Sequence, residues 1–168
     1  MQQGYAFISY STKNQAAADA IRELLKRKGI ATWMAPGDIP AGSKYAQVIN
    51  RAVKESSCLV LILTEDAQNS VWVAKEVERA INCRRPIIPV QLEDVILNDE
   101  FALYISNEQL VTIRKIDEDS EEVQRLLTGL IPYTGAAASP SPVCNSESKQ
   151  MPGQTIACYT LPHPEVKR

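Results

Sequence analysis

Along residues 1–131, short apolar runs alternate with longer segments in which apolar and polar positions repeat at helical spacing. Short runs rich in apolar residues predict five strands, at 5–10, 30–34, 58–63, 86–91 and 110–113. Between and after these runs, apolar residues recur every three or four positions, as on the buried face of a helix. This spacing predicts five helices, at 13–28, 45–53, 71–82, 98–106 and 120–130. The regular alternation is typical of an α/β protein.

The predicted strands are expected to form one parallel sheet, because right-handed crossovers through the helices return the chain to the same end of the sheet. The run 58–63 is apolar at every position, which predicts a central strand covered by helices on both faces. Five strands favour the flavodoxin-like order 2-1-3-4-5, whose crevice lies at the carboxyl ends of strands one and three. We therefore expect residues 9–11, 64–66 and 36–42 to surround one cleft.

The prolines divide the chain at about residue 131. Six of the ten prolines lie between Pro132 and Arg168, beside the small-residue run 135–139. No helical or strand period is sustained there, and such a composition predicts a disordered tail or linker. We expect a folded domain at 1–131 and a Pro/Ser/Ala-rich disordered C-terminal tail at 132–168.

The remaining composition excludes several classes of function. The net charge is -2, so the chain has no broad basic field and we expect no binding to nucleic acid. The single histidine, His163, lies in the predicted tail, which argues against Ser-His or Cys-His catalysis. None of the four cysteines has the spacing of a zinc site, so we expect no metal and no cofactor.

The location of the protein is also constrained by its apolar runs. The longest of them, 58–63, is far too short to span a membrane. The N-terminal residues lack the basic and apolar regions of a signal peptide. We expect a cytoplasmic protein that makes no contact with a membrane.

The helix predicted at 71–82 carries the sharpest local signal. Four apolar residues form its buried stripe: Val73, Val77, Ala80 and Ile81. At about 100° per residue, Trp72 and Glu76 lie to one side of that stripe and are neighbours one turn apart. A tryptophan beside a carboxylate near the crevice can stack a flat ring and counter a positive charge. In the more common alternative, Trp72 covers a neighbouring loop and Glu76 pairs with Lys75 or Arg79 in solvent.

The loop that follows the second strand contains Gly37 and Gly42, which invites comparison with a phosphate-binding loop. Such a loop needs Lys and then Ser or Thr after its second glycine, but here Ser43 precedes Lys44. The glycines are therefore expected to turn the chain rather than to hold a phosphate.

Three segments of the chain, 5–11, 33–42 and 72–77, resemble a Toll/interleukin-1 receptor (TIR) domain of the bacterial type. The segment 87–95 fits the same type, and the resemblance spans about residues 4–131. It implies the flavodoxin-like fold that the periods predict. It also implies one of two functions, because some TIR domains are adaptors that signal through TIR–TIR contacts, while others cleave NAD+ at the nicotinamide–ribose bond.

The catalytic members carry a glutamate on the third helix, within a W-x-x-x-E motif in the bacterial proteins, and Trp72 and Glu76 match that motif here. The resemblance therefore implies an NAD+ glycohydrolase (NAD+ nucleosidase) in bacterial defence or signalling, with Glu76 as the catalytic carboxylate and NAD+ as substrate rather than cofactor. Its products are nicotinamide and either ADP-ribose or cyclic ADP-ribose. Because nicotinamide leaves as a neutral molecule, one carboxylate suffices and no general acid is required.

The resemblance also implies which residues contact the substrate, either by stacking on its rings or by meeting the nucleotide after the first strand. These are Trp72, Phe7, Ser9, Tyr10, Ser11 and Trp33. Some family members have an arginine just after the first strand, where this chain has Ser11 and Thr12, so the contact to the pyrophosphate is left without an assigned residue.

The loop at 36–44 corresponds to the family's BB loop, which contacts a second TIR domain and helps to complete a composite active site. Its candidate contact residues are Pro36, Gly37, Asp38, Ile39, Pro40, Gly42 and Lys44. We therefore expect self-association, or association with other TIR domains, and weak activity as a monomer. The alternative function is a non-enzymatic TIR adaptor or interaction module that acts through the BB loop.

Overall fold

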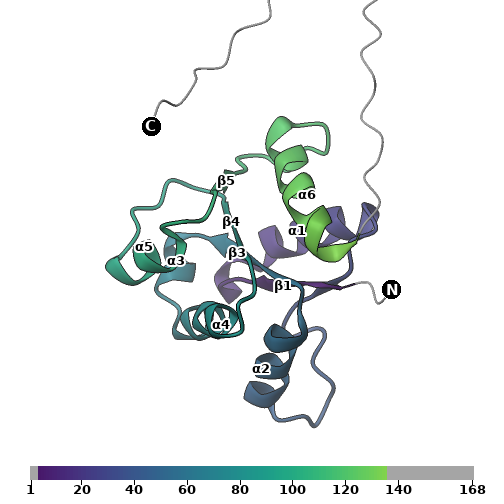
Figure 1. Cartoon of the computed structure of the whole chain (residues 1–168), viewed down its shortest axis with the longest axis vertical. Helices are drawn as coiled ribbons and strands as arrows, with labels where there is room; N and C mark the ends of the chain where they lie inside the picture. Colours follow the sequence, from purple (N-terminus) through teal and green to yellow (C-terminus); the bar gives the residue numbers. More distant parts are fainter. Residues whose placement is uncertain (1–3, 136–168) are drawn as a thin grey trace, which may run out of the picture. The chain divides into compact units, whose positions relative to one another are not determined.

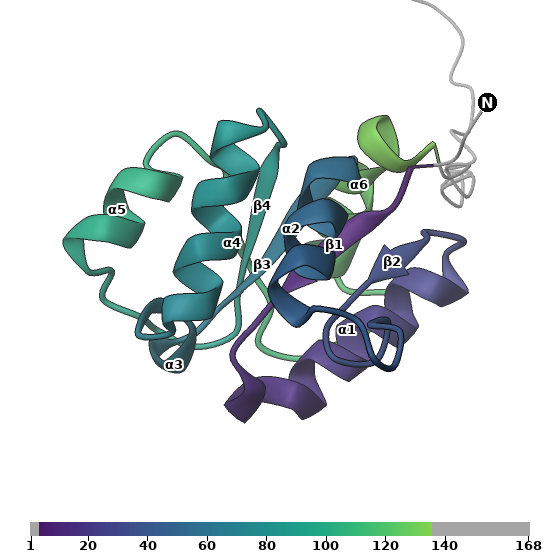
Figure 2. The same ribbon diagram turned by 90° about the horizontal axis from the view of Figure 1, so that it is seen from below.

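The computed structural model describes residues 4–135. Five parallel strands form one sheet in the order β2-β1-β3-β4-β5, and helices cover both of its faces (Figures 1 and 2). The strands are β1 (Ala6–Ser9), β2 (Thr32–Trp33), β3 (Cys58–Leu63), β4 (Ile87–Gln91) and β5 (Val111–Thr112). The predicted α/β class and the flavodoxin-like order are confirmed.

The helices follow the strands in the predicted alternation, with one short addition after β3. They are η1 (Thr12–Asn14), α1 (Gln15–Arg27), α2 (Tyr45–Glu55), α3 (Glu65–Gln68), α4 (Val71–Asn82), α5 (Asp99–Ile105) and α6 (Glu121–Thr134). Within residues 4–135, none of these helices combines the length and the apolar character that a membrane span requires.

The sheet separates two hydrophobic cores, because side chains alternate between its faces along each strand. Helices α1 and α6 cover one face, while α2, α4 and α5 cover the other (Figure 2). All six residues of β3 are fully buried and divide between the two cores. This explains why the segment 58–63 is apolar at every position.

The two edge strands are shorter than the sequence predicts. Each has only two paired residues, whereas runs of five and four residues, 30–34 and 110–113, were expected. β2 pairs with β1 only at Thr32 and Trp33, although Ile30 and Met34 on either side are still buried. Buried residues therefore extend beyond the hydrogen-bonded ladder. The apolar run in the sequence records which residues are buried, and not which residues are paired.

Helix α3 lies in a segment for which the sequence predicts neither a helix nor a strand. The side chain of Thr64 accepts a hydrogen bond from the backbone amide of Ala67 (3.1 Å), and two acidic residues, Glu65 and Asp66, occupy the first turn. Both features stabilise a helix N-terminus. They are visible in the sequence, but a helix of four residues is too short to show a period.

Helix α6 ends four residues beyond the predicted end at about residue 130 and includes Pro132, the first residue of the predicted tail. Its last turn is packed, because Thr134 is 3% exposed and its hydroxyl donates to the carbonyl of Leu130 (2.9 Å). Gly135 then ends the helix with a φ of 67°, in the left-handed region that glycine adopts readily. The rest of the predicted disordered tail, 136–168, lies outside the described residues.

Candidate functional site

A buried hydrogen bond joins α4 to the end of β1. The hydroxyl of Ser9 donates to Oε2 of Glu76 at 2.6 Å. Ser9 is fully buried, and Glu76 is only 9% exposed. The alternative in which Glu76 pairs with Lys75 or Arg79 in solvent is therefore wrong.

One of the four residues on the buried face of α4 differs from the predicted stripe. Ile81, which was expected to be buried, is 41% exposed, and Glu76 is buried instead. The observed set has the spacing i, i+3, i+4, i+7 of a single helix face. It consists of Val73, Glu76, Val77 and Ala80. A carboxyl group thus occupies a position that an apolar side chain usually fills.

Burial has a direct effect on the ionisation of this carboxyl group. Removal from water disfavours the charged form and raises the pKa of Glu76 from 4.5 to about 7, while the hydrogen bond from Ser9 lowers that pKa in part. Near neutral pH, Glu76 therefore exchanges between its protonated and ionised forms.

A groove of about 360 Å³ lies between α2 and α4, within the size range of small-molecule sites. Glu76 and Trp72 both line it, so the structure brings together the two residues of the W-x-x-x-E motif. Its lining residues come from the facing sides of the two helices: Ala46, Ile49, Asn50, Val53, Trp72, Lys75, Glu76, Glu78, Arg79 and Asn82.

Trp72 presents an aromatic surface at this groove. The residue is 50% exposed, and the ring of Tyr45 meets its ring edge-on with the centroids 5.7 Å apart. The ammonium group of Lys75 lies 5.3 Å from the centroid of the Trp72 ring, within the range of a cation–π contact. These two neighbours restrict the orientation of the ring and leave it accessible to solvent.

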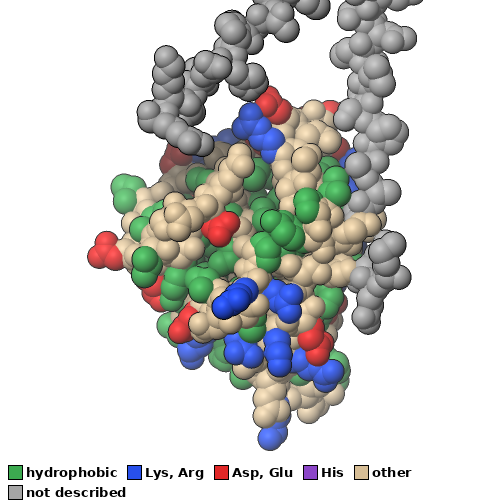
Figure 3. Space-filling model, in the orientation of Figure 1, with side chains coloured by type: hydrophobic (Ala, Val, Ile, Leu, Met, Phe, Trp, Pro, Cys, Tyr) green, Lys and Arg blue, Asp and Glu red, His purple; other side chains and the backbone are tan. Residues whose placement is uncertain are grey.

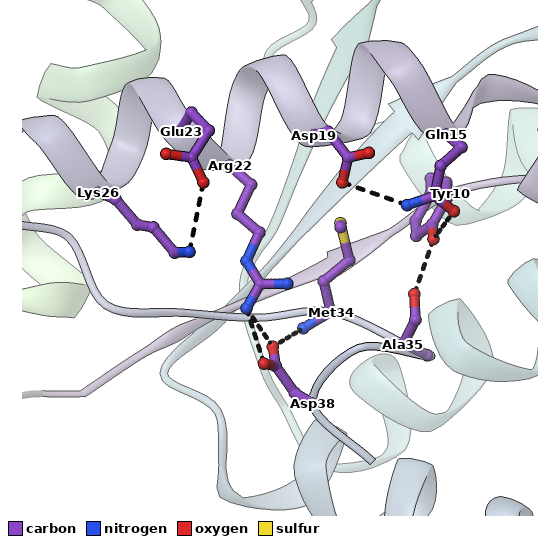
Figure 4. Close-up of polar contacts among 9 residues, drawn as sticks. All are labelled: Tyr10, Gln15, Asp19, Arg22, Glu23, Lys26, Met34, Ala35 and Asp38. Carbon is purple, nitrogen blue, oxygen red and sulfur yellow. Dashed lines mark hydrogen bonds and ion pairs between the residues drawn. The ribbon is translucent and has the colours of Figure 1, made fainter.

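The remaining substrate-contact candidates lie outside the groove lining. Phe7 is fully buried and stacks on the half-buried Trp33, with centroids 5.0 Å apart. Tyr10 is 9% exposed, and its hydroxyl donates to the carbonyl of Ala35 (2.7 Å) and contacts the side chain of Gln15 (Figure 4). Ser11 is also buried. Of the first-strand candidates, Ser9 is hydrogen-bonded to a groove residue, Glu76.

The cleft expected at the carboxyl ends of β1 and β3 is crossed by polar contacts. Thr64, which is 2% exposed, donates to Asn14 (2.7 Å). The ammonium group of Lys13 lies 2.8 Å from the carboxylate of Asp66. These groups bind one another across the strand ends, while the groove between α2 and α4 is an open site next to Glu76.

The loop before α2 is anchored by Asp38, whose side chain points toward α1 (Figure 4). Both carboxylate oxygens of Asp38 lie 2.7 Å from Nη2 of Arg22, and one accepts the backbone amide of Met34 at 2.8 Å. Ile39 packs against the core below α2 and α4. Asp38 and Ile39 therefore hold the loop in place, whereas five other candidates are exposed: Pro36, Gly37, Pro40, Gly42 and Lys44.

Several groove residues were not identified from the sequence. Lys75 and Arg79 were considered only as solvent partners of Glu76, and Asn50 and Asn82 were not considered at all. Their spacing on α2 and α4 offers a signal only when the two helices are known to face each other. Within the described range, no group of three His, Cys, Asp or Glu side chains is arranged to hold a metal ion.

The chain belongs to the TIR domain family, because residues 6–127 match the family model described as "TIR domain". A search of curated proteins finds no match. Solved structures show the same fold at low sequence identity. The TIR domain of the Toll-related receptor TRR-2 from Hydra magnipapillata is 16% identical with a TM-score of 0.64, covering 74% of this chain and 96% of that chain.

Two further structures extend the comparison. The TIR domain heterodimer of RPS4 and RRS1 is 17% identical with a TM-score of 0.55, and the match covers 78% of this chain and 98% of that chain. BcmB, a CMP N-glycosidase from Clostridium botulinum, is 15% identical with a TM-score of 0.50, and the match covers 73% and 97%. At these identities, the likeness shows the fold alone.

The raised pKa of Glu76 predicts how stability depends on pH. Between pH 4.5 and about 7, the unfolded chain ionises Glu76 while the folded chain keeps it protonated, so the free energy of unfolding falls as pH rises. At about 1.4 kcal/mol per pH unit, the loss is on the order of 3 kcal/mol. Glu76→Gln stays neutral and lacks this loss, so its stability relative to the wild type increases from pH 5 to pH 8.

Urea denaturation of both proteins at four pH values between 5 and 8 measures this difference. The two proteins share every other titrating group, so the difference between their stability curves reports the ionisation of Glu76 alone. Parallel curves of stability against pH would show that Glu76 ionises normally.

Proposed function

We propose that this TIR domain is an NAD+ glycohydrolase and that Glu76 is its catalytic carboxylate. The observation that carries the proposal is the buried carboxyl group of Glu76 in the groove, held by Ser9 and placed one helical turn from the exposed ring of Trp72. The matching W-x-x-x-E motif of catalytic TIR domains supports the same assignment. The proposed setting is a bacterial defence or signalling system.

The proposed reaction breaks the bond between ribose C1′ and the ring nitrogen of nicotinamide. The bonding electrons pass to that nitrogen, so neutral nicotinamide leaves and positive charge develops on the ribose as an oxocarbenium ion. The carboxylate of Glu76 counters this charge and accepts hydrogen bonds from ribose hydroxyls. Water then adds to C1′ and releases a proton, which gives ADP-ribose. Attack by an adenine nitrogen instead of water gives the cyclic product.

The site has physical properties that suit this chemistry. In a poorly solvated position, a carboxylate stabilises a developing cation more strongly than it does in water. The surface of Trp72 provides a stacking platform for nicotinamide or adenine. The fold is also compatible with cleavage of N-glycosidic bonds, since BcmB is by its name a CMP N-glycosidase.

Replacement of Glu76 tests the proposal. We expect Glu76→Ala and Glu76→Gln to lower nicotinamide release from NAD+ by about 100-fold or more, because neither side chain can carry the negative charge that the reaction needs. Release is measured with concentrated protein by chromatography. Glu122→Gln, an exposed glutamate on α6 that does not line the groove, is the matched control and should retain activity. The enzyme function is wrong if the wild type releases no nicotinamide or if the Glu76 variants release as much.

Replacement of Ser9 tests how the carboxyl group is tuned. The hydroxyl of Ser9 lowers the pKa of Glu76, so in Ser9→Ala that pKa rises further and a higher pH is needed to form the active carboxylate. Loss of a hydrogen bond to a charged group predicts an upward move of about one pH unit in the midpoint of kcat/KM, with activity recovered above that midpoint. Ser9→Cys keeps a weak donor, so its midpoint of kcat/KM should lie between those of the wild type and Ser9→Ala. An unchanged midpoint would contradict this role of Ser9.

The second candidate function, an adaptor that works through the loop before α2, is favoured by the exposure of five loop residues on an anchored backbone. RPS4 and RRS1 form a heterodimer of TIR domains. We propose that the same kind of contact also completes the active site, so that the two functions share one surface.

This coupling predicts that specific activity rises with protein concentration. Charge reversal at the loop, Lys44→Glu, should move the rise to higher concentration, whereas Lys115→Glu, which is exposed outside the loop, should match the wild type. Nicotinamide release and light scattering over a hundredfold concentration range measure both effects. Specific activity that does not change over that range would rule out the composite site, and association without any release would favour the adaptor.

A further inference from the structure

Arg79 lines the groove, and its side chain forms no hydrogen bond with residues 4–135. Its Nε is buried without a hydrogen-bond partner, and the residue takes part in none of the ion pairs within that range. Arg22 and Arg85 also have an unpaired Nε, but their Nη2 atoms bind Asp38 and the carbonyl of Lys54. A buried donor without a partner is costly, so the position of Arg79 indicates a missing acceptor.

Neither of the acidic residues near Arg79 on α4 supplies that acceptor. Glu76 accepts from Ser9, and Glu78 is exposed and forms no ion pair within residues 4–135. The surrounding surface is basic: Figure 3 shows Lys and Arg side chains gathered over α2 and α4. The groove lining itself contains two basic residues, Lys75 and Arg79, and two acidic ones, Glu76 and Glu78, so an anionic group is favoured beside Arg79 rather than throughout the groove.

We propose that the groove contains an anion subsite in which Arg79 binds a phosphate group of the nucleotide substrate. This inference rests on the proposed function, and it supplies the pyrophosphate contact that Ser11 and Thr12 leave without a residue. The ligand class is a phosphorylated riboside, and the groove should discriminate against the same riboside without phosphate. The fork of the arginine guanidinium matches the oxygens of a phosphate, and such charge-assisted pairs are the stronger hydrogen bonds.

The spacing along α4 agrees with the structure of a nucleotide. Glu76 and Arg79 are three residues apart on one helix, a separation of about 5–6 Å between their Cβ atoms. In a nucleotide, C5′ of the ribose carries the phosphate and C1′ carries the base, so the two lie on either side of one sugar ring. A ribose held at Glu76 therefore has its phosphate within reach of Arg79. Asn50 and Asn82 also line the groove and add amide donors.

Binding of ADP-ribose to the full chain tests the subsite without turnover when Glu76 is replaced by Gln. We expect Glu76→Gln to bind ADP-ribose, and addition of Arg79→Met to weaken binding at least tenfold, as measured by calorimetry. Arg79→Lys should be intermediate, because lysine keeps the charge but not the fork. Arg84→Met removes the same charge from an exposed position just after α4 and should change binding less than twofold.

Inorganic pyrophosphate distinguishes a substrate subsite from a general anion site. We expect it to bind Glu76→Gln at least tenfold more weakly than ADP-ribose. Equal binding of the two ligands, an unchanged affinity in Arg79→Met or an equal loss in Arg84→Met would each overturn the proposal, as would an absence of ADP-ribose binding.

Nicotinamide release by the protein with Glu76 intact separates this inference from the proposed function. Release that is unaffected by Arg79→Met would overturn the subsite and leave the glycohydrolase in place. Arg79-dependent binding of ADP-ribose in a protein that releases no nicotinamide would support the subsite and overturn the glycohydrolase.

Discussion

The candidate site depends on the hydrogen bond between Ser9 and Glu76. It lies where the inner strand β1 ends, and it allows a carboxyl group to occupy a helix position whose neighbours on the same face are apolar. A buried carboxyl group is costly unless it is hydrogen-bonded, and Ser9 supplies that partner. Because β1 is flanked by β2 and β3, Ser9 is fixed by the sheet, and the position of Glu76 is fixed in turn.

The electrostatics of the groove follow from this burial. Removal from water raises the pKa of Glu76 to about 7, so the group can change its charge near neutral pH. One turn along α4, Arg79 brings a positive charge to the same groove, and its side chain has no acceptor among residues 4–135. The groove thus combines a carboxyl group suited to a developing cation with a guanidinium group suited to a phosphate. The proposed substrate, NAD+, carries both features.

The sequence predicted the fold well, because burial on one or two faces imposes a period. β3 is apolar throughout because helices cover both of its faces, and α4 was located within its observed bounds because Val73, Val77 and Ala80 repeat at helical spacing. The lengths of β2 and β5 were not predictable, since an apolar run records burial and not the number of ladder hydrogen bonds. Helix α3 is stabilised mainly by its cap and is too short for a period.

The site was predictable only in part. The motif identified Trp72 and Glu76, but the residues gave no sign that Glu76 is buried, because a carboxylate interrupts an apolar stripe in the same way whether it faces solvent or a hydroxyl. Asp38 was expected to contact a second TIR domain, and nothing in the sequence indicated its contacts with Arg22 and Met34. Arg79 was placed in solvent for a similar reason: α2 faces α4 only in the folded chain. Contacts between distant segments decide these features, and no local period records them.

In the proposed function, a buried carboxyl group with a pKa near neutrality performs the chemistry. The most direct measurement is a carbon-13 NMR titration of the Glu76 side-chain carboxyl, compared with the pH dependence of nicotinamide release. We expect both to have a midpoint near pH 7 and the two midpoints to coincide. A Glu76 midpoint near 4.5, or a rate of release that does not follow its ionisation, would contradict it.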